Sequence, residues 1–240
     1  MDFSQEELVE IIDRLVAGMM ERAGVTAAPV NALAVAEHHL GIPVQFVEPA
    51  EEDDSGRRRP RSRPPGSGIT LTTDMSDEQQ QKAAAAGIAQ LLIPDILRKL
   101  SVAPGAESKQ FVTHVRGLIV PRILIPGKLL RAALRDCKYD LPALKRVFTT
   151  AGVELIALRL LDLDTPCVIA IVDDGVVALR RGNQSAESRK LSDAEQECVE
   201  RVGELDLPHR ARVGEWTAWG WPVPGRAFRR ILLRAVRDDV

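Results

Sequence analysis

The chain has 240 residues, 45% of them hydrophobic, and a formal net charge of −2. This length allows one large domain or a domain with a small appendage, and the near-neutral charge gives no overall attraction to nucleic acid or to a membrane surface. The three cysteines are widely spaced and form no Cys-x-x-Cys pair, which argues against a disulfide framework and against a cysteine zinc site. The acidic N-terminus lacks the basic and apolar regions of a signal peptide, and no apolar stretch is long enough to span a bilayer. We therefore expect a cytoplasmic protein with no membrane contact.

Two helices are predicted in the first forty residues. Residues 4–23 have a typical N-cap residue, Ser4, followed by apolar residues at helical spacing. A second helix is expected over residues 29–40, and a first strand follows it. His38 and His39 near its end are adjacent, so they point to different sides of the helix and do not chelate one metal ion together.

Residues 48–68 are the low-complexity segment of the chain. An acidic run over residues 51–54 precedes a run rich in arginine, proline and glycine, and this composition opposes folding. We therefore expect a loop inserted between two strands. Its five arginines are candidates for contact with nucleic-acid phosphates or with an acidic partner, although a solvated loop whose acidic half neutralises its basic half is the preferred interpretation. They are Arg57, Arg58, Arg59, Arg61 and Arg63.

An extended segment from Gly68 leads into a helix whose first residues have the pattern of a capping box. Ser76 is the predicted N-cap, and Gln79 lies three residues later. The helix then contains the string Ala86-Gly87-Ile88-Ala89-Gln90-Leu-Leu. In the ImmA/IrrE-type metallopeptidases, a similar strand and helix lead into His-Glu-(Ile/Leu)-(Ala/Gly)-His-Leu-Leu. The string therefore resembles the active-site helix of that family with its three polar residues replaced.

Flanking segments carry the same resemblance. Residues 24–44 resemble the family's first helix and strand, and residues 117–126 resemble its Phe-Ala-Ala-x-Leu-Leu-Met-Pro segment. Residues 140–148 and 154–163 are similar to its closing helices. The resemblance implies an α+β fold in residues 1–165, with zincin-like helices packed on a small twisted sheet.

The chemistry of a zinc peptidase is missing from the matching positions. In an HExxH site, two imidazoles at i and i+4 hold the zinc ion and the glutamate is the general base. Ala86 offers no donor atom, Gly87 has no side chain to take a proton, and the Gln90 amide is a poor zinc ligand. The family's third ligand, a carboxylate, falls by resemblance on Thr113, beside His114. We expect no catalytic residue, no bound metal and no cofactor; His114 is a candidate groove residue, with a surface or hydrogen-bonded core histidine as the preferred interpretation.

Residues 166–240 have a different pattern and are predicted to form a small α+β domain or an extension of the first sheet, with a hairpin and helices. Asp173-Asp-Gly175 is a hairpin-turn signal between two apolar strands, and Ser192 is the predicted cap of a helix over residues 193–204. An extended segment over residues 215–224 holds all three tryptophans, which we expect to fill the core of a small sheet.

A final helix is predicted over residues 226–237. By helical spacing, four arginines fall on one side of it: Arg226, Arg229, Arg230 and Arg234. The predicted helix over residues 153–163 is instead apolar almost all round, which does not favour DNA readout through it.

These residues support three interpretations of function. The first is a catalytically inactive metallopeptidase-like protein that binds a protein partner as a regulatory module, in transcriptional or stress regulation. Active members of the family act on helix-turn-helix repressors, so the resemblance implies a partner of that kind, held in the former active-site groove around Ala86, Gln90 and His114. The second, less favoured, is a nucleic-acid-associated regulator that uses the arginine loop and the final helix. The third is an active metallopeptidase with unorthodox ligands among His38, His39, His114 and acidic neighbours.

Overall fold

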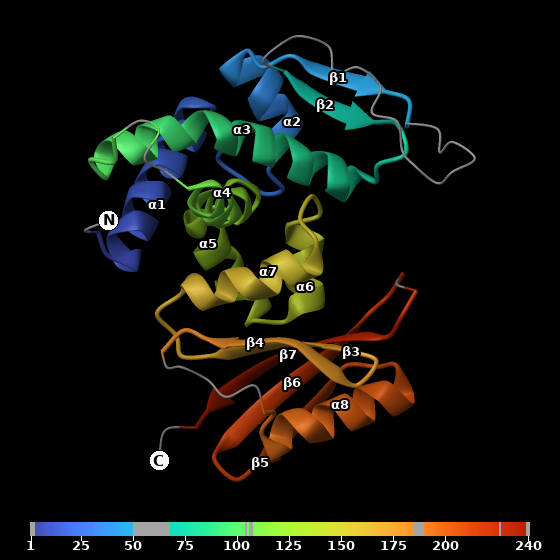
Figure 1. Cartoon of the computed structure of the whole chain (residues 1–240). Helices are drawn as coiled ribbons and strands as arrows, with labels where there is room; N and C mark the ends of the chain where they lie inside the picture. Colours follow the sequence, from blue (N-terminus) through green and yellow to red (C-terminus); the bar gives the residue numbers. More distant parts are fainter. Residues whose placement is uncertain are drawn as a thin grey trace. The chain divides into compact units, whose positions relative to one another are not determined.

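Figure 1 shows the computed structural model of the chain, which divides into two compact units. The first unit comprises Met1–Tyr139 and Ala143–Gly152, and the second comprises Asp140–Pro142 and Val153–Val240. The structure describes residues 3–49, 68–103, 105, 108–184, 190–225 and 227–238. The loop arginines Arg57, Arg58, Arg59, Arg61 and Arg63 lie outside these ranges, as does Arg226. The fold is mixed α+β, as predicted.

The first unit combines helices with a two-stranded parallel sheet. Its elements in chain order are α1 (Gln5–Arg22), α2 (Ala32–Ala34), the π-helical turn η1 (Val35–His39), β1 (Val44–Val47), β2 (Ile69–Thr72), α3 (Asp77–Lys99), α4 (Lys109–Leu124) and α5 (Gly127–Cys137). The helix α6 (Leu141–Val147) runs across the boundary between the units. β1 and β2 flank the predicted loop, and the sheet that they form lies alongside α3 (Figure 1).

Local sequence signals set where the long helices of this unit begin. The Ser4 hydroxyl accepts a hydrogen bond from the Glu7 backbone N–H at 3.0 Å, which caps α1. At α3, the Ser76 hydroxyl accepts from the Gln79 backbone N–H while the Gln79 side chain accepts from the Ser76 backbone N–H at 2.8 Å. The predicted capping box is therefore confirmed.

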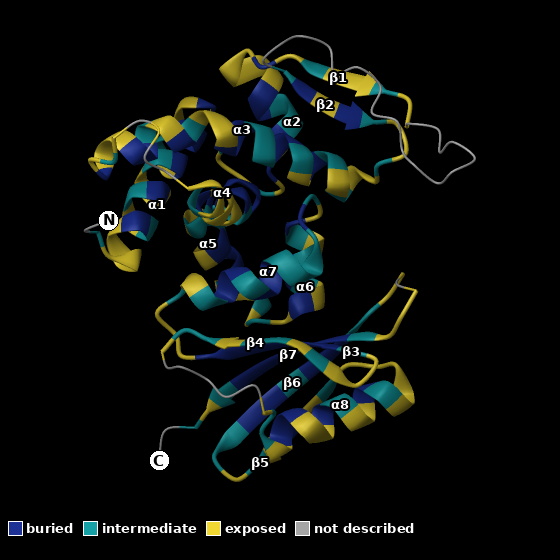
Figure 2. Ribbon diagram, viewed as in Figure 1, coloured by how far each residue is buried: buried dark blue, intermediate teal, exposed yellow. Residues whose placement is uncertain are grey.

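The second unit is a five-stranded antiparallel sheet with helices packed against it. Its elements are α7 (Val153–Arg159), the 3-10 turn η2 (Leu160–Asp162), β3 (Val168–Asp173), β4 (Val176–Gly182), α8 (Asp193–Leu205), β5 (His209–Val213), β6 (Trp216–Val223) and β7 (Arg230–Arg237). The strand order is β4-β3-β7-β6-β5. Buried residues of α8, among them Cys198 and Val202, form one core cluster with the central strands, which Figure 2 shows as the buried part of the sheet.

Two sequence signals in this unit are confirmed. Asp174 and Gly175 have φ angles of 47° and 81°, the left-handed pair that a two-residue hairpin turn requires, and they join β3 to β4. Ser192 caps α8 through a second capping box, with Glu195 as its partner.

The predicted final helix is wrong, because residues 230–237 form the strand β7. This strand lies between β3 and β6, and five successive residues from Ile231 to Ala235 are buried. A strand covered on both faces shows no polar–apolar alternation, so its sequence resembles a buried helix. The arginine face inferred from helical spacing therefore does not exist.

The division between the units falls at Gly152, whereas the sequence analysis places it at residue 165. α7 belongs with the sheet because Arg230 of β7 donates to the Glu154 carboxylate at 3.0 Å. Trp221 is 6% exposed, and its indole N–H donates to Asp140 at 3.3 Å, which links residues 140–142 to the same unit. Trp221 thus fills the core as expected, whereas Trp216 and Trp219 are only half-buried.

A buried ion pair connects β4 to the first turn of α8. Arg180 reaches both carboxylate oxygens of Glu195, with Nε–Oε1 at 3.1 Å and Nη2–Oε2 at 2.9 Å. The side chains are 3% and 0% exposed, so water screens neither charge. The same carboxylate completes the capping box, so a single group fixes the helix start and its attachment to the sheet.

Replacing Glu195 with glutamine should lower the free energy of unfolding by about 3–5 kcal/mol, because it removes the negative charge that faces the buried Arg180 guanidinium. Urea unfolding followed by circular dichroism measures this loss. The control is Glu204→Gln, whose exposed pair with Arg201 has side chains 62% and 56% exposed; it should change stability by less than about 1 kcal/mol. Equal losses in the two variants would contradict the assigned role of the buried pair.

Candidate functional site

The candidate site lies on the middle of α3, at the string that resembles a peptidase helix. Ala86 and Gln90 are four residues apart and therefore share one side of the helix. Ala86 is half-buried and Gln90 is exposed, while Ile88 and Ala89 are buried in the core of the first unit. The two positions that would hold the metal in a peptidase thus lie at the boundary between core and solvent. We refer to Ala86, Gly87 and Gln90 as the α3 site.

Gly87 is the point at which β2 packs most closely on α3. A Cβ atom at this position would lie 2.4 Å from Ile69 Cγ1 and 2.7 Å from Ile69 Cδ1. Both distances are far below van der Waals contact, so only glycine fits while β2 stays in place. The side chain of Ile69, which is 7% exposed, therefore occupies the space that a side chain at residue 87 would need.

The neighbouring helix α4 carries the other two predicted site residues. Thr113 and His114 are both exposed, whereas Val115 and Ile119 form the buried side of the helix. Among the described residues, no hydrogen bond or ion pair joins Thr113 or His114 to the α3 site. His38 and His39 in η1 are exposed as well.

The described residues contain no group of three histidine, cysteine, aspartate or glutamate side chains placed to hold a metal ion. Two of the three cysteines are also poor thiolate donors. Burial raises the pKa of the Cys167 thiol above its ordinary value and raises the pKa of Cys198 to about 11. At neutral pH both thiols are therefore protonated, and neither is a ready ligand or nucleophile.

Gln81 is a residue of this region that the sequence analysis missed. It is 8% exposed, and its side-chain oxygen accepts the Ala32 backbone N–H at 2.7 Å while its amide nitrogen donates to the Asn31 side chain at 3.1 Å. These bonds join α3 to the cap of α2. A second connection runs from the start of α3 to α6, where Lys145 pairs with Glu78 at 2.6 Å. A mid-helix glutamine gives no sequence signal of such a role.

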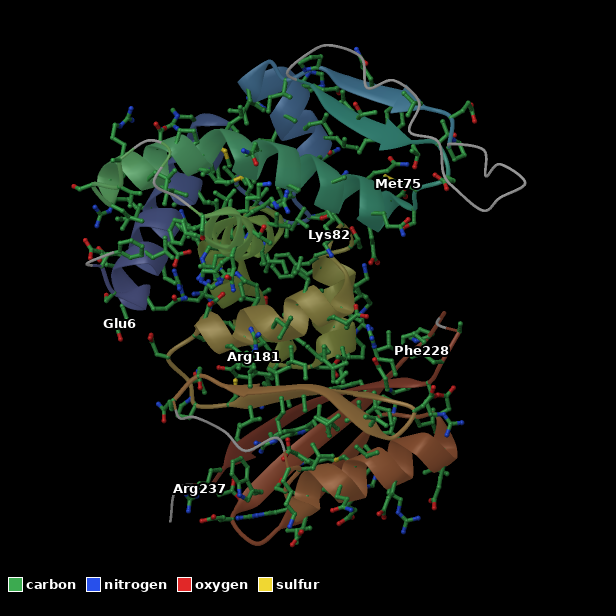
Figure 3. The ribbon with its side chains drawn as sticks, viewed as in Figure 1. Glu6, Met75, Lys82, Arg181, Phe228 and Arg237 are labelled. Atoms are coloured by element: carbon green, nitrogen blue, oxygen red, sulfur yellow. The ribbon has the colours of Figure 1, made fainter. Side chains whose placement is uncertain are left out.

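The side of α3 next to the site exposes an apolar side chain. Leu91 is 51% exposed beside Gln90, and Ala83 and Ala86, one turn apart, are only half-buried. Figure 3 shows the side chains along this helix, with Lys82 labelled on its second turn and Met75 just before its start. The exposed part of this side of α3 therefore combines small residues, the Gln90 amide and one large apolar side chain.

Two of the arginines that were predicted on the final helix are held by contacts within the second unit. Arg230 pairs with Asp173 at 2.7 Å and with Glu154 at 3.0 Å, and the hydrogen bond that it donates to Asp173 raises its pKa above the ordinary value. Arg234 is 6% exposed and lies against the Trp219 ring, 5.2 Å from its centroid. Both charges are therefore committed within the second unit.

No protein-family model and no curated protein sequence matches this chain. Among solved structures, a transcriptional regulator from Mycobacterium tuberculosis has a similar fold, with a TM-score of 0.71 and 15% sequence identity. The match covers 96% of this chain and 81% of that one. At this identity the likeness establishes the fold and no more. None of the described helices is long and apolar enough to cross a bilayer.

The contact between Gly87 and Ile69 predicts a specific pattern of stabilities. Gly87→Ala should lower the free energy of unfolding by about 1–3 kcal/mol, because the added methyl group overlaps Ile69. Gly117→Ala in α4 is the matched control, since nothing lies within 4 Å of the added Cβ there. It should raise stability by about 0.5–1 kcal/mol through helix propensity.

The double variant Gly87→Ala/Ile69→Ala separates this overlap from other causes. Once Ile69 is shortened to alanine, the methyl group at residue 87 has room. The losses of unfolding free energy in the two single variants should therefore sum to more than the loss in the double variant. Urea unfolding of all four proteins measures the coupling. Additive losses would show that β2 does not exclude a side chain at residue 87.

Proposed function

We propose that the chain is a catalytically inactive, metallopeptidase-like regulatory module that binds a protein partner through the α3 site. The observation that carries the proposal is the packing at Gly87. The resemblance places a general base at residue 87, and a Cβ atom at this position would lie only 2.4 Å from Ile69 Cγ1. Without a base and without imidazoles at residues 86 and 90, this helix has no means of activating water.

The surface of α3 supports binding rather than chemistry. The Leu91 side chain is exposed, so a partner that covers it would remove apolar surface from water. The adjacent Gln90 amide offers a hydrogen-bond donor and an acceptor to the backbone of a peptide. Ala83 and Ala86 leave the helix surface open to close approach by another chain. A segment of a partner protein laid along this side would bury apolar surface and use the amide for orientation.

The partner class follows from the family resemblance and from the fold. Active ImmA/IrrE-type peptidases act on helix-turn-helix repressors, and a protein with this fold is a transcriptional regulator. We infer that a helix-turn-helix regulator is the partner and that holding it, instead of cutting it, is the regulatory act. The resulting role is in transcriptional or stress regulation.

A binding assay with paired variants tests this proposal. The purified chain is titrated against the helix-turn-helix regulators of its own source organism, and Gln90→Trp is compared with Lys99→Trp. Both residues are exposed on α3, but Lys99 ends the helix, three turns away from the α3 site. We expect at least one regulator to bind intact, with affinity reduced about tenfold or more by Gln90→Trp, since a bulky side chain blocks the approach. Lys99→Trp should leave binding unchanged.

Two results would contradict the proposal. Cleavage of a regulator by the chain would restore the peptidase interpretation. Equal binding by the two tryptophan variants would place the interface away from the α3 site.

A further inference from the structure

The first unit contains a cavity that the α3 site does not use. It has a volume of about 410 Å³ and lies between α1, the turn at Val25 and the segment from Arg122 to Leu129. This volume is within the range of small-molecule sites, whereas packing voids in native cores rarely exceed a water molecule. The cavity is therefore large enough to hold a small molecule.

The buried part of the cavity lining, which we call its floor, is apolar. Val16 and Met20 of α1 line it and are only 3% and 4% exposed, and Leu129 of α5 also lines the cavity. Successive turns of α1 place Val16 and Met20 next to each other. The floor therefore offers a surface for an aliphatic or aromatic group of a few carbon atoms.

A buried arginine stiffens one wall. The Arg122 side chain is 2% exposed, and it donates from Nε to Asp13 Oδ1 at 2.9 Å and from Nη1 to the Leu118 carbonyl at 2.9 Å. These bonds hold α4 to α1 across the cavity and neutralise the Asp13 charge. The wall is thus fixed before any ligand arrives.

The exposed part of the lining, which we call the rim, carries two side chains of opposite charge that form no ion pair with each other. Glu21 of α1 and Lys128 of α5 both line the cavity and are both exposed. Among the described residues, neither forms an ion pair, with the other or with a third group. The first turn of α5, which also lines the cavity, adds positive potential on the side of Lys128. The exposed part of the lining therefore carries one negative and one positive side chain, above an apolar floor.

We propose that this cavity binds a small zwitterion with an apolar side chain, of the class of the aliphatic and aromatic α-amino acids. The ammonium group pairs with Glu21, the carboxylate pairs with Lys128, and the side chain lies on Val16 and Met20. Such a ligand pairs with both Glu21 and Lys128, whereas an acid or an amine alone pairs with one of them and leaves the other charge unmatched. This site is separate from the α3 site, and it makes the first unit responsive to a metabolite of that class.

Calorimetric titration of the full chain with L-leucine, L-methionine and L-phenylalanine tests the proposal. We expect at least one of them to bind saturably and to raise the melting temperature. For the tightest binder, the analogue without the amino group and the analogue without the carboxylate should each bind about tenfold more weakly. For leucine these analogues are 4-methylpentanoate and 3-methylbutylamine.

Variants at the rim assign the two charges. Glu21→Gln should weaken the amino acid about tenfold and leave the acid analogue unchanged, while Lys128→Gln should weaken the amino acid and leave the amine analogue unchanged. Glu10→Gln, an exposed α1 residue outside the cavity, should have no effect. The proposal would be overturned if none of the three amino acids binds. It would also be overturned if the analogues with a single charge bind as tightly as the amino acid. The same holds if the Glu21 and Lys128 variants bind the amino acid as tightly as the wild type does.

Discussion

The contact between Gly87 and Ile69 is the constraint on which the first unit depends. β2 can lie against α3 only because residue 87 has no side chain, since a Cβ there would lie 2.4 Å from Ile69 Cγ1. Any side chain at residue 87 would overlap Ile69, so the packing of the strand on the helix requires glycine there. Under the proposed function, the same packing leaves no room for a glutamate at this position.

The second unit reaches its stability by a different route. Its central strand, β7, is buried on both faces, and α8 is fastened to the sheet by the buried Arg180–Glu195 pair. Charges in this unit are paired internally, as Arg230 is with Asp173 and Glu154. Both of the binding sites that we propose lie on the first unit.

Local signals were enough to predict much of the fold. Ser76 with Gln79 and the Asp174–Gly175 turn act within a few residues, so sequence alone identifies them. The strand β7 was mistaken for a helix because burial on both faces removes the alternation that marks a strand. The sequence alone shows that residues 86, 87 and 90 are neither histidine nor glutamate. It does not show why glycine is needed at residue 87, because the residue that would overlap a side chain there, Ile69, lies on a separate strand.

Features made by distant segments were beyond sequence reasoning. Gln81 contacts Asn31, fifty residues away, and the cavity brings α1 together with the start of α5. No periodicity or motif in the sequence indicates these contacts, because they depend on how the helices pack. The candidate binding residues Glu21 and Lys128 are, in the sequence, indistinguishable from other surface charges.

Metal content tests the central claim most directly. The chain is purified without chelators and without a metal-affinity tag, and zinc is measured by elemental analysis against protein concentration. We predict zinc far below stoichiometry, because residues 86, 87 and 90 supply neither ligand nor base. About one zinc ion per chain would contradict this, since a closed site of that occupancy requires three or four protein ligands that the α3 site lacks.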